Sequence, residues 1–167
     1  MQLSRDDYTV AWICALGLEL TAAKAMLDED HEDLDIHNDD NAYILGRIGR
    51  HNIVIATLPI GGYGTVSAAA VVTQLTSSFP SIRVGLLVGI GGGIPKGDTD
   101  IRLGDVVVSK PAGMHGGVVQ HDLGKAIKGG NFERTGILNR PPQVFLTAIN
   151  KLEATKTTKL SLIIDSL

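Results

Sequence analysis

The stretch Thr9-Val-Ala-Trp-Ile-Cys-Ala15 decides the fold class, because it is a short apolar run rich in residues that favour β-structure. Charged residues precede it and Gly17 follows it, as is typical of a buried strand. Residues 18–27 come next and have the pattern of a helix, since their apolar side chains fall near one face. A buried strand that leads directly into a helix predicts an α/β layer fold.

Further strands are indicated on both sides of the middle of the chain. Residues 42–48 and 53–58 have the pattern of two strands, and Gly49-Arg-His-Asn52 between them is a hairpin signal. Residues 84–90 are apolar throughout, which predicts a central strand covered on both faces. Residues 105–109 form a further apolar run of strand type.

Two more helices are expected. Residues 65–77 are rich in Ala and Val, with Thr65 as the N-cap. Residues 143–152 follow Pro141-Pro142, and proline suits the first turn of a helix.

The remaining segments are less regular. Residues 117–121 are a shorter strand candidate, and residues 122–140 are glycine-rich and polar, which indicates a long loop. Residues 153–167 are first rich in Thr and Lys and then apolar. We find no internal repeat and no linker composition, so a single domain is expected in the 167 residues.

Composition and charge exclude several classes of protein. Glycine accounts for 20 residues and aromatic residues for only 4%, so the core must consist mainly of aliphatic side chains, with many tight turns. Eight acidic residues between 28 and 40 occur without Lys or Arg, so the rest of the chain carries +5 within the total of −3. We expect this acidic run to be a solvated loop, because like charges repel. The modest net positive charge outside this run is compatible with an anionic small ligand but too weak to indicate nucleic-acid binding.

The chain has the character of a cytoplasmic protein without a membrane partner. No apolar run approaches the roughly 20 residues of a membrane helix, and residues 1–7 lack the apolar stretch of a signal peptide. The single Cys14 cannot form an internal disulfide, which agrees with a reducing compartment. Its place in an apolar strand predicts an unreactive buried thiol.

Two glycine-rich loops are candidate ligand contacts. Gly89-Ile-Gly-Gly-Gly93 follows a strand, but Pro95 and Gly97 come where a dinucleotide fingerprint would need a helix, so the Rossmann interpretation is disfavoured. These glycines would instead let a flat ligand approach the backbone. Residues 61–64 precede a helix and could contact an anion or a sugar hydroxyl, although their spacing alone favours an ordinary strand-to-helix turn.

Glu19 is the candidate catalytic residue. In isolation it reads as a solvent-facing helix residue, but if the first strand is central, Glu19 lies where α/β sheets bind ligands. His115, His121 and Asp122 fit no zinc spacing and are interpreted as loop residues. We therefore expect no metal and no cofactor.

Five motifs follow one another along the chain; they are Trp12-Ile-Cys-Ala-Leu-Gly-Leu-Glu19, Gly46-Arg-Ile-Gly-Arg-His-Asn52, Gly61-Gly-Tyr-Gly-Thr-Val-Ser-Ala-Ala69, Val88-Gly-Ile-Gly-Gly-Gly-Ile-Pro95 and Leu103-Gly-Asp-Val-Val-Val-Ser109. In order and spacing they resemble the purine and uridine phosphorylase superfamily. Together with Gly117-Val-Val-Gln-His-Asp-Leu-Gly124 and Leu138-Asn-Arg-Pro-Pro142, they also resemble the phosphorylase-like N-terminal domains of fungal NLR-type proteins.

The resemblance implies a three-layer α/β/α fold with a mixed central sheet, and cleavage of the N-glycosidic bond of purine nucleosides or nucleotides. Such cleavage passes through an oxocarbenium-like cation and needs a nucleophile, groups that grip the ribose and an acid that protonates the base. By resemblance, Glu19 positions or activates the nucleophile. Gly62 and Gly64 match the loop beside the ribose, and Gly91 and Gly92 match the strand end that lines the base pocket.

Two departures from the family pattern bear on activity. Leu87 and Ile90 stand in the region where the hexameric phosphorylases carry phosphate-binding Arg and Ser, so water is favoured over phosphate as nucleophile. The family's ribose-gripping Met-Glu pair and its base-protonating Asp lie beyond the point that matches Leu152, and Asp165 does not reproduce them.

We therefore expect residues 7–152 to be the N-terminal part of a nucleoside phosphorylase-like domain and residues 153–167 to be an atypical tail. On this interpretation the chain is truncated and does not catalyse the family's reaction by itself. The alternative is a non-catalytic nucleoside-binding module that serves as an effector or sensor in a fungal NLR-like protein. Homo-oligomers are usual in the family and are compatible with either hypothesis.

Overall fold

The computed structural model describes residues 3–37, 39–94 and 101–164. The chain divides into two compact units, Met1–Ile94 and Pro95–Leu167. None of the helices within the described ranges is both long enough and apolar enough to cross a membrane.

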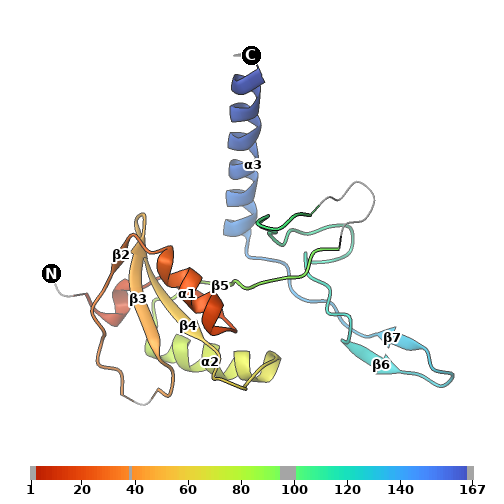
Figure 1. Cartoon of the computed structure of the whole chain (residues 1–167). Helices are drawn as coiled ribbons and strands as arrows, with labels where there is room; N and C mark the ends of the chain where they lie inside the picture. Colours follow the sequence, from red (N-terminus) through yellow and green to blue (C-terminus); the bar gives the residue numbers. More distant parts are fainter. Residues whose placement is uncertain (1–2, 38, 95–100, 165–167) are drawn as a thin grey trace. The chain divides into compact units, whose positions relative to one another are not determined.

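The first unit contains a five-stranded mixed sheet (Figure 1). In the sheet the strands follow the order β2-β3-β4-β1-β5, with β1 parallel to both β4 and β5, and β3 antiparallel to β2 and β4. Their bounds are β1 Val10–Cys14, β2 Glu29–Asp30, β3 Tyr43–Ile48, β4 His51–Thr57 and β5 Val84–Leu87. Strand β1, which lies within the apolar stretch at residues 9–15, is thus an interior strand with parallel neighbours on both sides.

Helices cover both faces of this sheet. Alternation along the strands sends Ala11 and Ile13 into one apolar cluster with Leu75 of helix α2 (Thr65–Ser78). The residues of opposite parity, such as Cys14, join Ala23 of helix α1 (Gly17–Ala25) in a second cluster. The predicted three-layer α/β/α architecture with a mixed sheet is therefore confirmed. A short 3-10 helix, Arg5–Asp7, precedes β1.

The second unit has little regular structure before its helix. Strands β6 (Gly124–Ala126) and β7 (Phe132–Arg134) pair as an antiparallel hairpin, and helix α3 spans Gln143–Ile164. Gly129 and Gly130 both have positive φ in the connecting turn, a conformation that glycine adopts without strain. Lys110 pairs with Glu153 of α3 at 2.8 Å.

Several predicted strands are wrong in extent or position. The predicted central strand at residues 84–90 ends at Leu87 and lies at the edge of the sheet, because β1 is its only partner strand within the described residues. Residues 105–109 and 117–121 form no strand, and Val106–Val108 are exposed. The long loop predicted at residues 122–140 contains the β6–β7 hairpin.

Helix boundaries also differ from the predictions. Helix α2 is capped by Gly64, with φ +92°, and Thr65 is its first helical residue rather than its N-cap. Helix α3 continues beyond Leu152 to Ile164, so most of the predicted atypical tail is helical.

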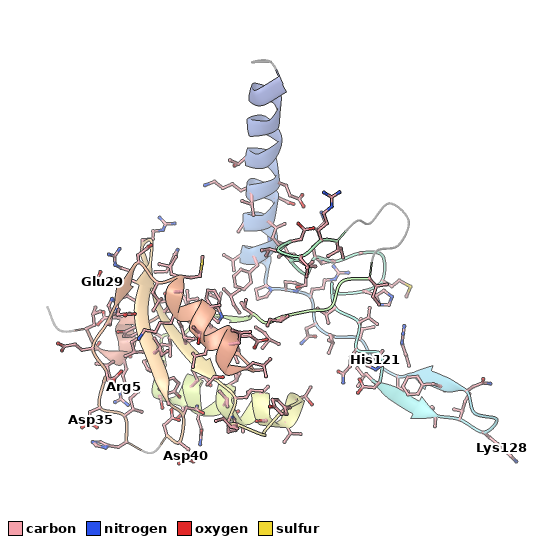
Figure 2. The ribbon with its side chains drawn as sticks, viewed as in Figure 1. Arg5, Glu29, Asp35, Asp40, His121 and Lys128 are labelled. Atoms are coloured by element: carbon pink, nitrogen blue, oxygen red, sulfur yellow. The ribbon has the colours of Figure 1, made fainter. Side chains whose placement is uncertain are left out.

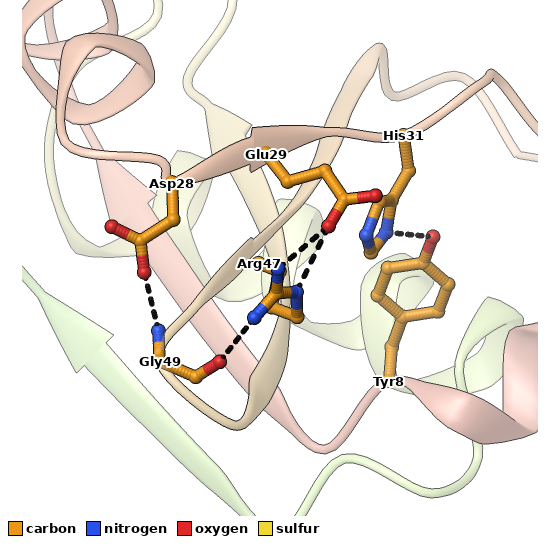
Figure 3. Close-up of polar contacts among 6 residues, drawn as sticks. All are labelled: Tyr8, Asp28, Glu29, His31, Arg47 and Gly49. Carbon is orange, nitrogen blue, oxygen red and sulfur yellow. Dashed lines mark hydrogen bonds and ion pairs between the residues drawn. The ribbon is translucent and has the colours of Figure 1, made fainter.

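The acidic run is not the fully solvated loop that charge repulsion predicts. Glu29 lies in β2 and accepts hydrogen bonds from Arg47 at 2.7 and 3.0 Å, and Asp28 accepts from the Gly49 N–H at 2.6 Å (Figure 3). Asp35 and Asp40, by contrast, are exposed along the connection between β2 and β3 (Figure 2). Arg47 thus compensates the charge of Glu29, and the Gly49 N–H satisfies an oxygen of Asp28.

Asp39 is the most enclosed member of the acidic run. Its carboxylate accepts hydrogen bonds from the Tyr43 hydroxyl, the Ser78 hydroxyl and the Asn41 N–H. Partial burial opposes ionisation, but the hydrogen bonds from Ser78, Tyr43 and Asn41 together lower the pKa of Asp39. Because Ser78 ends α2, this contact ties the acidic segment to the helix.

Candidate ligand site at the carboxyl edge of the sheet

The predicted site residues of the first unit follow three adjacent parallel strands. Glu19 comes after β1, Gly62 and Gly64 come after β4, and Gly91 and Gly92 come after β5. Because β4, β1 and β5 are neighbours and run parallel, their carboxyl ends lie at one edge of the sheet. Ligands of open α/β sheets bind in the crevice outside this edge.

Glu19 lies in the first turn of α1, and its carboxylate is turned back onto backbone N–H groups. Oε2 accepts hydrogen bonds from Ala15 and Leu16 at 2.8 and 2.9 Å, and Oε1 accepts one from Ile90 at 2.8 Å. The Leu16 contact satisfies the N-cap amide of α1, as the acidic residue of a capping box does. The interpretation of Glu19 as an ordinary solvent-facing helix residue is therefore wrong.

The electrostatic consequence is that Glu19 is an ionised carboxylate at ordinary pH. The hydrogen bond from the Ile90 N–H contributes most to lowering the pKa of Glu19; partial burial opposes the shift, and the Ala15 and Leu16 bonds add to it. A negative charge near the start of α1 also agrees with the sign of the helix dipole. Glu19 can thus accept hydrogen bonds or face a developing positive charge, but it cannot act as an acid at neutral pH.

Residues 61–64, after β4, form a turn that favours glycine at two of its positions. Gly61 and Gly64 have φ values of +81° and +92°. The Gly62 N–H donates to the Pro59 carbonyl at 2.9 Å, and a Cβ on Gly62 would lie 3.0 Å from Pro59 Cγ and 3.1 Å from Ser67 Oγ. This backbone is therefore held close to the start of α2, where side chains would interfere.

The loop after β5 combines one crowded glycine with two open ones. A Cβ on Gly89 would lie 2.7 Å from Glu19 Oε1, whereas no atom lies within 4 Å of the corresponding positions on Gly91 and Gly92. The space beside Gly91 and Gly92 is what a ligand that approaches the backbone would need, as predicted for them. Their contact with a ligand remains a prediction.

The chemical character of the edge is apolar, with a single negative charge. Among residues 15–19, 58–64 and 88–94, Glu19 is the one charged side chain. The exposed large apolar side chains of the same three segments are Leu16, Leu18, Ile60, Tyr63, Val88, Ile90 and Ile94. Such an edge suits a neutral ligand with hydroxyl donors and a flat apolar part better than a free phosphate.

Cys14, His115, His121 and Asp122 are the other side chains that were weighed for reactive roles. Cys14 is fully buried and donates to the Ala56 carbonyl, and burial raises the pKa of its thiol, so the predicted burial is confirmed and low reactivity stays a prediction. His115, His121 and Asp122 lie in the second unit. No group of three or more His, Cys, Asp or Glu among the residues with described placement could hold a metal ion.

Two residues of the site were not identified from the sequence as Glu19 partners. In the sequence Gly89 is one glycine among several in its loop, and the aliphatic side chain of Ile90 indicates only that it cannot bind phosphate. The backbone N–H of Ile90 carries its role, and a backbone donor leaves no signal in residue type.

The fold is that of an α/β protein, with a candidate ligand edge at the ends of three parallel strands. The chain belongs to the phosphorylase superfamily, whose family profile matches residues 9–157. It is 55% identical over 157 residues to a nucleotide-binding leucine-rich repeat (NLR)-like protein of Hyaloscypha variabilis. That alignment covers 93% of this chain but only 16% of the relative. No solved structure matches the chain.

Proposed function

We propose that this chain supplies part of the nucleoside site of a domain that cleaves the N-glycosidic bond of purine nucleosides or nucleotides. The observation that carries the proposal is the ionised Glu19 carboxylate, at the shared edge of β1, β4 and β5 with open glycine backbone nearby. Membership of the phosphorylase superfamily supports the same class of chemistry.

The carboxylate has the properties that the nucleophile side of this reaction requires. Its oxygens accept three backbone hydrogen bonds, and a carboxylate has about four acceptor positions, so one remains for a water or a ribose hydroxyl. A fixed negative charge also stabilises the positive charge that develops on the ribosyl ring. Glu19 would therefore contact the nucleophile or the sugar.

The nucleophile is proposed to be water. A phosphate ion would meet the negative charge of Glu19 and no basic side chain in the three segments that follow the strands. The aliphatic side chains of Leu87 and Ile90 offer it no hydrogen-bond donors. Hydrolysis therefore fits this edge better than phosphorolysis.

A second function is favoured by a different observation. Cleavage also needs an acid that protonates the departing purine, and the three edge segments contain no acidic residue besides Glu19. The relative is called NLR-like, and the alignment covers a small part of it. A non-catalytic module that binds a nucleoside and serves as an effector or sensor within a larger protein would need only the binding edge.

Binding and turnover measured on the same protein separate these functions. The 167-residue chain is titrated with adenosine, inosine and AMP by calorimetry, and free base is measured by chromatography with and without phosphate. Base release without phosphate supports hydrolysis, saturable binding without release supports the module, and absence of binding overturns both for this chain. Glu19→Gln should weaken whichever activity is found, whereas Glu133→Gln, on exposed β7 of the other unit, should not.

A further inference from the structure

Gly89 differs from the other glycines of its loop in what surrounds it. A Cβ at this position would lie 2.7 Å from Glu19 Oε1 and 3.2 Å from Glu19 Cδ. Real Cβ atoms do not approach a neighbouring atom this closely, so the two groups exclude one another. The carboxylate occupies the space that a side chain at position 89 would fill.

We infer that Gly89 is a positioning residue: its missing side chain lets the Glu19 carboxylate reach the Ile90 N–H and hold the β5 loop against the end of β1. The carboxylate, Gly89 and the Ile90 N–H are called the clasp below. Its consequence for the ligand rests on the proposed function, but its formation does not.

A need for unusual backbone angles does not explain why residue 89 is a glycine. Gly89 is absent from the glycines with positive φ, so an alanine could adopt its backbone conformation. The requirement is space for an oxygen atom of a residue 70 positions earlier in the chain. Gly85, four residues earlier and within β5, is the contrasting case, because its Cβ would make an ordinary contact with Ile13 Cδ1 at 3.6 Å.

The clasp joins two adjacent strand ends at the centre of the ligand edge. The Val88 N–H donates to the Ile13 carbonyl at 2.9 Å, which is the final backbone bond between β1 and the chain leaving β5. Two residues further on, the Ile90 N–H donates to Glu19 of α1, whose other carboxylate oxygen accepts from Ala15 and Leu16, the residues that follow β1. The clasp therefore fixes the position of the backbone at Ile90, from which the loop continues to Gly91 and Gly92.

Both partners are needed in their native form. A glutamine at position 19 has one acceptor oxygen, so it cannot accept from Ile90 through one end while accepting from Ala15 and Leu16 through the other. Gly89→Ala and Glu19→Gln should thus break the same contact. Their effects on the Ile90 amide should not add, because each removes the contact on which the other acts.

The test compares Gly89→Ala with Gly85→Ala in the full chain by amide hydrogen exchange and by NMR titration of the Glu19 carboxyl. Loss of a hydrogen bond to a charged group should accelerate exchange at Ile90 by about tenfold or more in Gly89→Ala. The Glu19 carboxyl should then titrate nearer its ordinary value of 4.5, and Gly85→Ala should leave both signals unchanged. A purely structural defect would lower overall stability without moving the Glu19 titration.

Unchanged exchange at Ile90 and an unchanged Glu19 titration in folded Gly89→Ala would overturn the inference. If Gly89→Ala does not fold, the wild-type chain tests the same contact, because the Ile90 amide shift must follow the Glu19 carboxyl titration. A shift that ignores that titration overturns the clasp. Nucleoside affinity is measured separately: wild-type protein that shows the clasp but binds no nucleoside refutes the proposed function and leaves the clasp standing.

Discussion

The pair Asp39 and Asp40 provides a sharp test of how the acidic run is held. Both are consecutive aspartates in one segment, yet Asp39 accepts hydrogen bonds from Tyr43, Ser78 and Asn41, and Asp40 accepts one long bond of 3.3 Å from Gln74. A hydrogen bond to a charged group contributes about 1.5–3 kcal/mol. Because Asp39 is only partly buried and its donors would partly regain water, we expect Asp39→Ala to lower the free energy of unfolding by about 2–3 kcal/mol.

Asp40→Ala is the matched control and should change the free energy of unfolding by less than about 0.5 kcal/mol. Urea unfolding followed by the fluorescence of Trp12, the single tryptophan of the chain, measures both. The cost of Asp39→Ala should also depend on pH. The pKa of Asp39 is lowered in the folded state, so its stabilisation is complete above the unfolded value of about 3.9 and is lost as pH falls through the folded value. Equal effects of the two variants, or a cost that does not shrink in acid, would refute the reasoning.

Three further variants test the sheet and its core by urea unfolding. Gly46→Ala should cost about 1–3 kcal/mol, since its Cβ would lie 2.6 Å from the Glu29 carbonyl oxygen of β2; a cost no greater than that of Gly85→Ala would contradict this. Phe79→Ala should lower the free energy of unfolding by about 3–5 kcal/mol, because Phe79 is fully buried in the apolar cluster that contains Leu75 of α2. A loss under about 1 kcal/mol would contradict this and would show that neighbouring side chains collapse into the cavity. Arg47→Ala should cost at most about 1 kcal/mol, because its ion pair with Glu29 is exposed, and the cost should fall further in high salt; a large, salt-independent loss would argue against this.

The elements predicted correctly are those whose burial against neighbouring elements leaves a regular apolar pattern in their own sequence. Residues of β1 and β4 are apolar on both faces because α1 and α2 cover both, and the amphipathic pattern of the helices reports the same burial. The hairpin between β3 and β4 follows from Gly49, whose φ is +60°. In these segments sequence pattern and tertiary environment agree.

The errors fall where a strand depends on a distant partner. Residues 84–90 and 105–109 have similar apolar patterns, yet only the first run pairs, through Val84–Leu87 against β1. Apolar composition indicates that a strand can form but not which neighbour supplies its hydrogen bonds. The missed β6–β7 hairpin is different, because Gly129-Gly130 is a local turn signal that the polar composition of its surroundings obscured.

The site shows the same division between local and distant information. The position of Glu19 at the ligand edge follows from its place after β1, once β1 is known to be an interior parallel strand. Its contact with Ile90 could not be predicted, because it joins a side chain to a backbone group 71 residues later. The sequence nevertheless carries a trace of this contact in Gly89, which must lack a side chain for reasons of space. Glycines without positive φ at the ends of parallel strands can therefore mark places where a distant side chain, rather than a ligand, approaches the backbone.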